Sequence, residues 1–360
     1  MSMSRRTSAI GLREWKGLGP RASLLGLLVV ALVGCSDGGS GGDGDRTLVV
    51  HSSLAAEVLD HAEAAFEAAF PDVDVRVVAS TPEETLAAVR EGESVDVWWG
   101  APVTVLEAAA DEGRLQAYRP PWTSELTIGG DPDGRWHPSL VSPFVIAFNR
   151  ERLPLMRAPT EWNDLFHHRL WGEVLLPDPR RSPEMAYFVG AMLVEALRDD
   201  DDLLRGFDWH GRLDRSNAEY LGDTGEIVRR LGSGDALLTI LPRYVVERAR
   251  HDRAPWIHYR LPASGTPLLA LGIAITASAS DVEAARAFVD LTGGSDLATV
   301  ARLHTRWSPA SSDVDRADLP PDFELGATVR TFPLAADTIA RDLAAWLDRW
   351  DRDVRGRGAL

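Results

Sequence analysis

Short apolar runs alternate with amphipathic segments over residues 46–115, and this order predicts secondary structure. Apolar residues recur at helical spacing over 54–70, and another helix is expected from about 102 to 112. Thr81-Pro82-Glu83-Glu84 has the N-cap, the N1 proline and the capping-box glutamate of a helix start. Strands are predicted at 47–50, 73–78 and 95–99. The resulting β-α-β-α-β-α order indicates a parallel sheet covered on both faces.

The middle of the chain has the pattern of a second α/β unit. Strands are predicted at 144–148, 174–176 and 235–240. Helices are expected at 162–166, at 226–231 and from Ser182 to about 197. Further on, 268–276 is strand-like, and a capping box that begins at Ser280 opens a helix to 291. The last 30 residues contain an amphipathic helix with Ile339, Leu343, Trp346 and Leu347 on its apolar face.

The first 45 residues have a different pattern, in which basic residues precede an uncharged apolar run over 22–34. This run is shorter than the roughly 20 residues that span a bilayer easily. It ends in Leu32-Val33-Gly34-Cys35, which resembles the lipobox of bacterial lipoproteins. The resemblance implies a signal peptide over 1–35, cleavage before Cys35 and acylation of its sulfur, for example by palmitate. The alternative is an ordinary secretory signal with an incidental cysteine.

The amino-acid composition excludes several kinds of functional site. Cys35 is the single cysteine, so an intrachain disulfide, a Cys-based zinc site and a thiol redox pair are excluded. The only lysine is Lys16, so the rest of the chain cannot form a Walker-type loop or a pyridoxal Schiff base. Residues 36–45 are all Gly, Ser or Asp and are expected to form a flexible tether.

The net charge of the chain limits which partners it can be expected to bind. From residue 36 onward the chain carries 33 basic and 53 acidic residues, a net charge of -20. This disfavours nucleic acid and anionic lipid surfaces as general partners, although a local basic cleft remains compatible with it. The total length of 360 residues suggests about two domains.

A series of local runs carries a family resemblance. They lie at 48–53, 96–100, 160–165, 175–179, 232–236, 272–275, 284–290 and 307–309. With the order of the elements, they resemble type II periplasmic binding proteins. The likeness is strongest to the family-1 extracellular solute-binding proteins of the iron(III), sugar-phosphate and phosphonate group.

The resemblance covers about 46–330 and implies an α/β fold of two lobes joined by two crossover segments. Ligand would lie in the cleft between the lobes, which would close around it. One lobe would comprise 46–140 and 263–330, and the other 141–262. Residues 331–360 would form a C-terminal helix that packs on this body.

The implied function is that of a lipid-anchored, substrate-binding component of an ABC importer, without cofactor or catalysis. Its partners would be a small anionic ligand (an organophosphate, phosphonate or carboxylate), the permease subunits and the membrane, through acylated Cys35. We expect a monomer on the extracytoplasmic face of the cell envelope. A receptor that signals to a membrane partner is an alternative. An enzyme with a Ser-His-Asp site assembled from distant residues is another, although no His-Glu-x-x-His helix is present.

Ligands of open α/β sheets bind beyond the carboxyl ends of strands, at helix N-termini, and this rule selects candidate contacts. Ser52 and Ser53 end the first strand and could bind an anionic or hydroxylated ligand, or cap the following helix. Ser182 could face Ser52 across the cleft or act only as a cap. Thr224 and Gly225 precede a helix and are candidates too, unless they belong to an ordinary loop.

Trp99 and Gly100 end the third strand, where an aromatic ring can wall a pocket and glycine allows close backbone approach. Strand alternation leaves only one of Trp98 and Trp99 for the cleft, and we assign Trp99 to it.

Arg243 and Tyr244 follow the strand that ends at 240. In the ferric-binding members of the family, this region carries two adjacent tyrosines whose phenolates bind the metal. The resemblance puts Arg243 in place of one of them, which leaves Tyr244 as the phenolate of a ferric site. An arginine repels a cation and favours a phosphate or a carboxylate. We therefore expect an organic anion and no metal, with Arg243 as a ligand contact, and a ferric-ion receptor that uses Tyr244 is the alternative function. The alternative is that Arg243 pairs with an acidic group of the protein.

Overall fold

The structure, a computed structural model, describes residues 46–126, 128–311 and 329–357. The lipobox-like segment, Cys35 and the Gly/Ser/Asp tether lie outside the described residues. The described residues belong to one compact unit. No helix in the described ranges is both long enough and apolar enough to cross a membrane.

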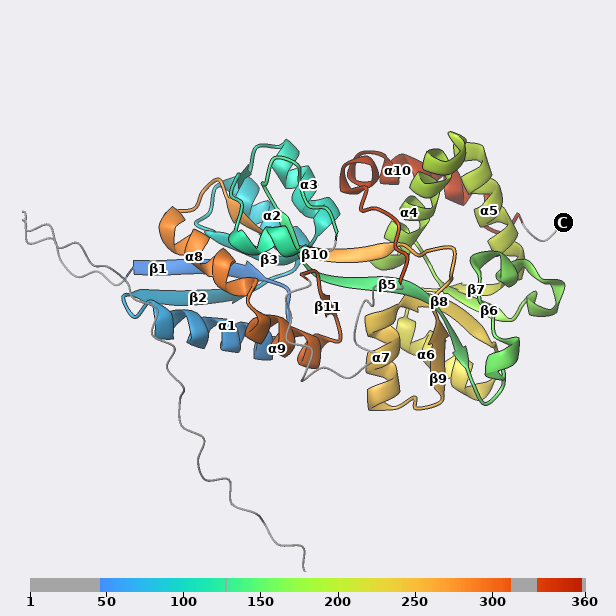
Figure 1. Cartoon of the computed structure of the whole chain (residues 1–360). Helices are drawn as coiled ribbons and strands as arrows, with labels where there is room; N and C mark the ends of the chain where they lie inside the picture. Colours follow the sequence, from blue (N-terminus) through green and yellow to red (C-terminus); the bar gives the residue numbers. More distant parts are fainter. Residues whose placement is uncertain (1–45, 127, 312–328, 358–360) are drawn as a thin grey trace, which may run out of the picture. The chain divides into compact units, whose positions relative to one another are not determined.

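A mixed β-sheet runs through the molecule in the order β2-β1-β3-β10-β5-β8-β6-β7 (Figure 1). Its first part contains β1 (Arg46–Ser52), β2 (Val73–Ala79) and β3 (Val97–Pro102), which are parallel as predicted. The prediction of a parallel sheet for this part of the chain is therefore confirmed, but the complete sheet is mixed. The chain returns to this sheet through β10 (Leu268–Thr276), which pairs antiparallel with β3.

The strand β5 (His137–Asn149) changes partners along its length. Residues up to Pro143 pair with β10, whereas residues from Phe144 pair with β8 (Leu238–Pro242) and β9 (Ile257–Arg260). We call residues 46–143 and 268–311 lobe 1, and residues 144–267 lobe 2. The chain passes from lobe 1 to lobe 2 along β5 and returns into β10, so these segments are the two connections between the lobes.

The helices and minor strands of lobe 1 are α1 (Ala56–Ala69), α2 (Pro82–Glu91), α3 (Val103–Asp111), β4 (Leu115–Gln116), η1 (Pro121–Glu125), α8 (Val282–Thr292), α9 (Ser295–Thr305) and β11 (Ser308–Pro309). Those of lobe 2 are η2 (Leu155–Arg157), η3 (Trp162–Phe166), η4 (His168–Leu170), β6 (Val174–Pro177), α4 (Pro183–Asp200), α5 (Leu203–Ser216), β7 (Asn217–Leu221), α6 (Thr224–Ser233) and α7 (Arg243–Asp252).

Two predicted helix caps have different outcomes. The capping box of α2 is confirmed: Thr81 Oγ1 accepts from the Glu84 N–H (3.2 Å), and the Glu84 carboxylate accepts from the Thr81 N–H (2.8 Å). The cap at Ser280 was wrong by one residue, because Asp281 caps α8. Ser280 instead donates its N–H and its hydroxyl to the buried carboxylate of Asp96 (2.6 and 3.0 Å).

The C-terminal helix α10 (Ala336–Asp353) contacts both lobes. It packs against α3 of lobe 1 and against α4 and α5 of lobe 2 (Figure 1). Its buried face contains Ile339, Trp346 and Leu347 as predicted, and Trp350 extends it. Just after the helix, Arg355 forms a double hydrogen bond with the buried Asp178 of lobe 2 (2.6 and 3.0 Å).

We expect the stability of this fold to fall in acid because of His210. His210 lies in α5, is 2% exposed, and has Nε2 3.3 Å from the Val189 carbonyl oxygen. Burial lowers the pKa of His210 to about 4. The unfolded chain, with a histidine pKa near ~6.5, then binds more protons than the folded chain, so the unfolding free energy decreases as pH falls from about 6.5 to 4.

Urea denaturation at pH 7, 6 and 5 would measure this effect. His210→Gln should reduce the loss between pH 7 and 5 by roughly 2 kcal/mol. The same change at His251, whose side chain is 66% exposed, serves as the control for replacing a histidine at the surface. Equal pH dependence in the wild-type and His210→Gln proteins would contradict the assignment.

Candidate functional site

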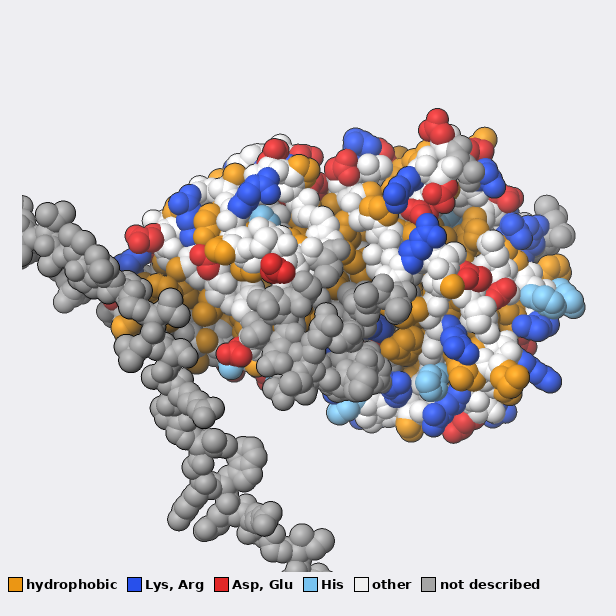
Figure 2. Space-filling model, in the orientation of Figure 1, with side chains coloured by type: hydrophobic (Ala, Val, Ile, Leu, Met, Phe, Trp, Pro, Cys, Tyr) orange, Lys and Arg blue, Asp and Glu red, His pale blue; other side chains and the backbone are white. Residues whose placement is uncertain are grey.

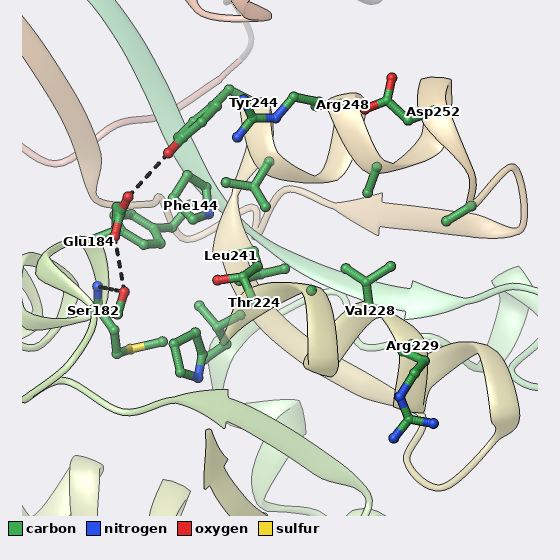
Figure 3. Close-up of a pocket in the computed structure, with 18 of the residues that line it drawn as sticks. Phe144, Ser182, Glu184, Thr224, Val228, Arg229, Leu241, Tyr244, Arg248 and Asp252 are labelled. Carbon is green, nitrogen blue, oxygen red and sulfur yellow. Dashed lines mark hydrogen bonds between the residues drawn. The ribbon is translucent and has the colours of Figure 1, made fainter. Parts of the chain in front are cut away.

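A groove of about 660 Å³ is lined by residues of both lobes. A second hollow, of about 790 Å³, lies in lobe 2 (Figure 3). Glu184, Tyr244 and Arg248 line both spaces, so the two are neighbouring parts of one site. We call the first space the interlobe groove and the second the lobe 2 hollow.

Six helices begin at these spaces. From lobe 1, the N-terminal residues of α1, α2 and α3 contribute Ala55, Pro82 and Thr104 to the interlobe groove. From lobe 2, α4 and α6 contribute their first residues, and α7 contributes its N-cap, Pro242, and its second residue, Tyr244. Helix N-termini carry free N–H groups and the positive end of the helix dipole. Their convergence therefore favours an anion.

Tyr244 lies where the two spaces meet. Its hydroxyl donates to Glu184 Oε1 (3.2 Å), and its ring stacks on Trp307 of lobe 1, with 4.5 Å between ring centroids and 23° between planes. Burial, with the neighbouring Glu184 carboxylate, raises the pKa of Tyr244 above its usual range. The phenol is therefore neutral, which disfavours its use as a phenolate.

Glu184 is held by two hydroxyl groups at the start of α4. Besides Tyr244, the Ser182 hydroxyl donates to Glu184 Oε2 (3.0 Å), and Ser182 Oγ accepts from the Met185 N–H (3.2 Å) (Figure 3). Ser182 therefore caps α4 and also lines the lobe 2 hollow.

Thr224 and Gly225 also line this hollow. They are the first residues of α6 rather than residues before it, because Asp223 is the N-cap and accepts from the Gly225 N–H (2.8 Å).

Arg248 supplies a positive charge that the sequence did not point to. It follows Tyr244 by one helical turn, and its guanidinium carbon lies 5.8 Å from the centre of the Tyr244 ring. The side chain is exposed, and within the described ranges it makes no hydrogen bond or ion pair. Arg248 follows Tyr244 at an i, i+4 spacing, which would have pointed to it as a neighbour of Tyr244 had a helix been predicted here.

Arg243 lies on the other side of α7. It is 1% exposed, its Nε is 3.5 Å from the Glu247 carboxylate, and its guanidinium donates to the hydroxyl of Ser308. It lines neither the interlobe groove nor the lobe 2 hollow.

Ser52 and Trp99 are also buried and line neither space. Ser52 Oγ accepts from the Leu54 N–H (3.2 Å). The Trp99 ring lies edge-on to Phe288, with 6.1 Å between centroids, and its indole N–H donates to Ser139 Oγ (3.3 Å). Trp98 is buried on the opposite face of the sheet, so neither of the two tryptophans walls the groove.

Ser53 and Gly100 line the interlobe groove together. The Ser53 hydroxyl donates to the Gly100 carbonyl oxygen (2.9 Å), which ties the end of β1 to β3. Gly100 has φ +89°, and a Cβ there would lie 2.7 Å from Leu54 Cγ. Glycine is therefore required both by the backbone and by the contact.

Charge is unevenly divided between the lobes. Residues 144–267 carry 17 arginines against 19 acidic residues, whereas the rest of the chain from residue 36 carries 16 against 34. Arginine side chains are spread over the visible face of lobe 2 (Figure 2). Lobe 2 is thus much less repulsive to an anion than its surroundings. In the described ranges, no three His, Cys, Asp or Glu side chains are grouped as a metal site.

Comparison with known proteins agrees with this architecture. The family model for bacterial extracellular solute-binding proteins matches residues 47–302. The chain belongs to this family. A probable ABC transporter periplasmic-binding protein, y4fP of Sinorhizobium fredii, is 26% identical over 277 residues, which cover 76% of each chain.

Solved structures of periplasmic binding proteins share the type II fold. The Trichodesmium protein IdiA (FutA), solved with iron and citrate, has a TM-score of 0.73 at 14% identity and covers 85% of this chain and 98% of its own. AfuA of Actinobacillus pleuropneumoniae, solved with fructose-6-phosphate, has a TM-score of 0.64 at 19% identity and covers 87% and 100%. At these identities, the likeness shows the fold alone.

Proposed function

We propose that this solute-binding protein is the substrate-binding component of an ABC importer and captures a small anionic solute by closure of its lobes. The convergence of six helix N-termini on a site that contains Arg248 carries the proposal. The name of the Sinorhizobium relative supports the transport role. The solute would be an organophosphate, a phosphonate or a carboxylate.

Ser53, Gly100, Ser182, Thr224 and Tyr244 are the proposed contacts that agree with the sequence analysis, since all five line the site. Arg248 takes the role that the sequence suggested for Arg243. Closure would bring the Ser53 side of lobe 1 towards the Tyr244 side of lobe 2, and the handover to a permease would depend on this closed shape.

A panel of anions tests the binding function. A matching solute should stabilise the protein by about 2.7 kcal/mol at a 100-fold excess over its Kd, measured as a rise in Tm. The panel includes alkylphosphonates, sugar phosphates, short carboxylates and ferric citrate. No rise with any organic anion would contradict the proposal, and a rise with ferric citrate alone would favour an iron receptor. We expect binding by the organic anions, because burial and Glu184 raise the pKa of Tyr244 and keep its phenol neutral, and because Arg248 repels a cation.

We also propose that the protein is anchored through acylated Cys35, with residues 36–45 as the tether. Expression with labelled palmitate should label the wild-type protein but not Cys35→Ser, and the variant should leave the membrane fraction. Equal membrane retention of both would indicate an uncleaved or differently anchored leader. The presence of permease and ATPase genes beside this one would distinguish an importer from a sensor.

A further inference from the structure

The charged side chains of the interlobe groove are few and of both signs. Two carboxylates, Glu83 and Glu184, and one guanidinium, that of Arg248, line it, together with His304. Much of the remaining wall is aliphatic or aromatic. These apolar residues are Leu54, Ala55, Pro82, Pro102, Val105, Pro183, Ala186, Tyr187, Leu269, Leu271, Trp307 and Leu343.

Glu184 and Arg248 flank the same tyrosine. The Glu184 carboxylate accepts the hydroxyl of Tyr244 (3.2 Å), whereas the Arg248 guanidinium lies 5.8 Å from the centre of the ring (Figure 3). In the described structure the two charges form no ion pair with each other. The Ser182 hydroxyl fixes the carboxylate from a second side (3.0 Å). The groove thus presents two opposite charges held apart by one aromatic ring.

We infer that the solute is a small zwitterion, an amino-carboxylate or an amino-phosphonate with an apolar carbon body. This inference rests on the proposed function and names its substrate class. The anionic group would bind Arg248, and the ammonium group would donate to Glu184 and lie against Tyr244. The methylene groups between them would contact the apolar wall.

Charge balance favours this class over a sugar phosphate. In the groove and the hollow together, three carboxylates (Glu83, Glu184 and Asp252) balance three guanidinium groups (Arg229, Arg248 and Arg253). A dianionic sugar phosphate would make this site net negative, and its hydroxyl groups would find few polar partners on the apolar wall of the groove. An amino-carboxylate adds no net charge and an amino-phosphonate adds at most one negative charge, and the ammonium group of either compensates a carboxylate that would otherwise be partly desolvated on closure.

Calorimetry with matched probe pairs tests the inference. The pairs are 4-aminobutyrate with butyrate, and 3-aminopropylphosphonate with propylphosphonate, and glucose 6-phosphate represents the sugar phosphates. In at least one pair, the amino form should bind at least ten-fold more tightly than its deaminated partner and than glucose 6-phosphate. Glu184→Gln should remove this preference and leave the deaminated probe bound equally well or better. Glu57→Gln, at an exposed first-turn position of α1, is the control and should change neither affinity.

The outcomes separate the two proposals. Tighter binding of deaminated probes or of glucose 6-phosphate would contradict the proposal of a zwitterionic solute. It would still agree with the proposal that the protein is an anion receptor. If Glu184→Gln lowers the affinity for both members of a pair equally, Glu184 only positions Tyr244. This result would also overturn the zwitterion proposal. No binding of any probe would contradict both proposals.

Discussion

Arg248→Gln is expected to weaken the binding of the anionic solute by about 10- to 100-fold. A hydrogen bond between charged groups contributes about 1.5–3 kcal/mol, and each 1.4 kcal/mol corresponds to about ten-fold in Kd. Arg248 is exposed at the groove and, in the described structure, has no carboxylate partner that would compete with the ligand. Its substitution should therefore change affinity far more than stability.

Titration calorimetry with the solute found in the anion panel would measure the loss. Arg198→Gln provides the control, because Arg198 is 60% exposed on α4 and lines neither the groove nor the lobe 2 hollow. Arg248→Lys should lose less affinity than Arg248→Gln, since lysine keeps the charge but not the bidentate geometry. Unchanged affinity in Arg248→Gln would contradict the placement of the anion.

Which of Arg243 and Arg248 faces the site could not be predicted from the sequence, because it depends on the helix that contains them. The pattern predicted the strand before Pro242, and β8 is there, but the helix α7 that follows was not predicted. Its sequence is dominated by charged residues, with little apolar periodicity to reveal a helix. Without the helix, Arg243 next to Tyr244 was the natural candidate, whereas helical geometry puts Arg248 on the Tyr244 face.

A second helix was missed next to a run of four acids at 199–202. The helix α4 ends at Asp200, Asp201 is in the left-handed conformation, and Asp202 is the N-cap of α5. By contrast, β1, α2 and β10 were predicted correctly, because local apolar runs and local caps decide them.

The tryptophan pair illustrates a non-local effect. Alternation correctly puts Trp98 and Trp99 on opposite faces of β3, since each belongs to a different hydrophobic cluster. Both faces of the sheet are covered, however, so neither side chain reaches the groove. A single strand contains no information about which layers cover it, and the site residues at strand ends depend on that arrangement.

The second large effect concerns stability, which Glu247→Ala is expected to lower by about 3–5 kcal/mol. Glu247 is 4% exposed on α7 of lobe 2, and its carboxylate accepts from Arg302 Nη2 (2.9 Å) of α9 in lobe 1. It also accepts from the Tyr259 hydroxyl (3.2 Å) and lies 3.5 Å from Arg243 Nε. Burial, opposed by the Glu247 charge, lowers the pKa of Arg302 to about 10.

Removing the carboxylate would leave two buried guanidinium groups close to one another without this shared counter-charge, which is why the expected loss exceeds that of an ordinary ion pair. Guanidinium denaturation of Glu247→Ala, with Glu226→Ala as the control, would measure it. Glu226 pairs with Arg229 (2.5 Å) on the exposed side of α6, where an ion pair contributes at most about 1 kcal/mol. A loss below 1 kcal/mol in Glu247→Ala would contradict the role of this cluster. Because the pair with Arg302 joins α7, the helix of Tyr244 and Arg248, to α9 of lobe 1, its removal should also weaken solute binding, and Glu226→Ala should not.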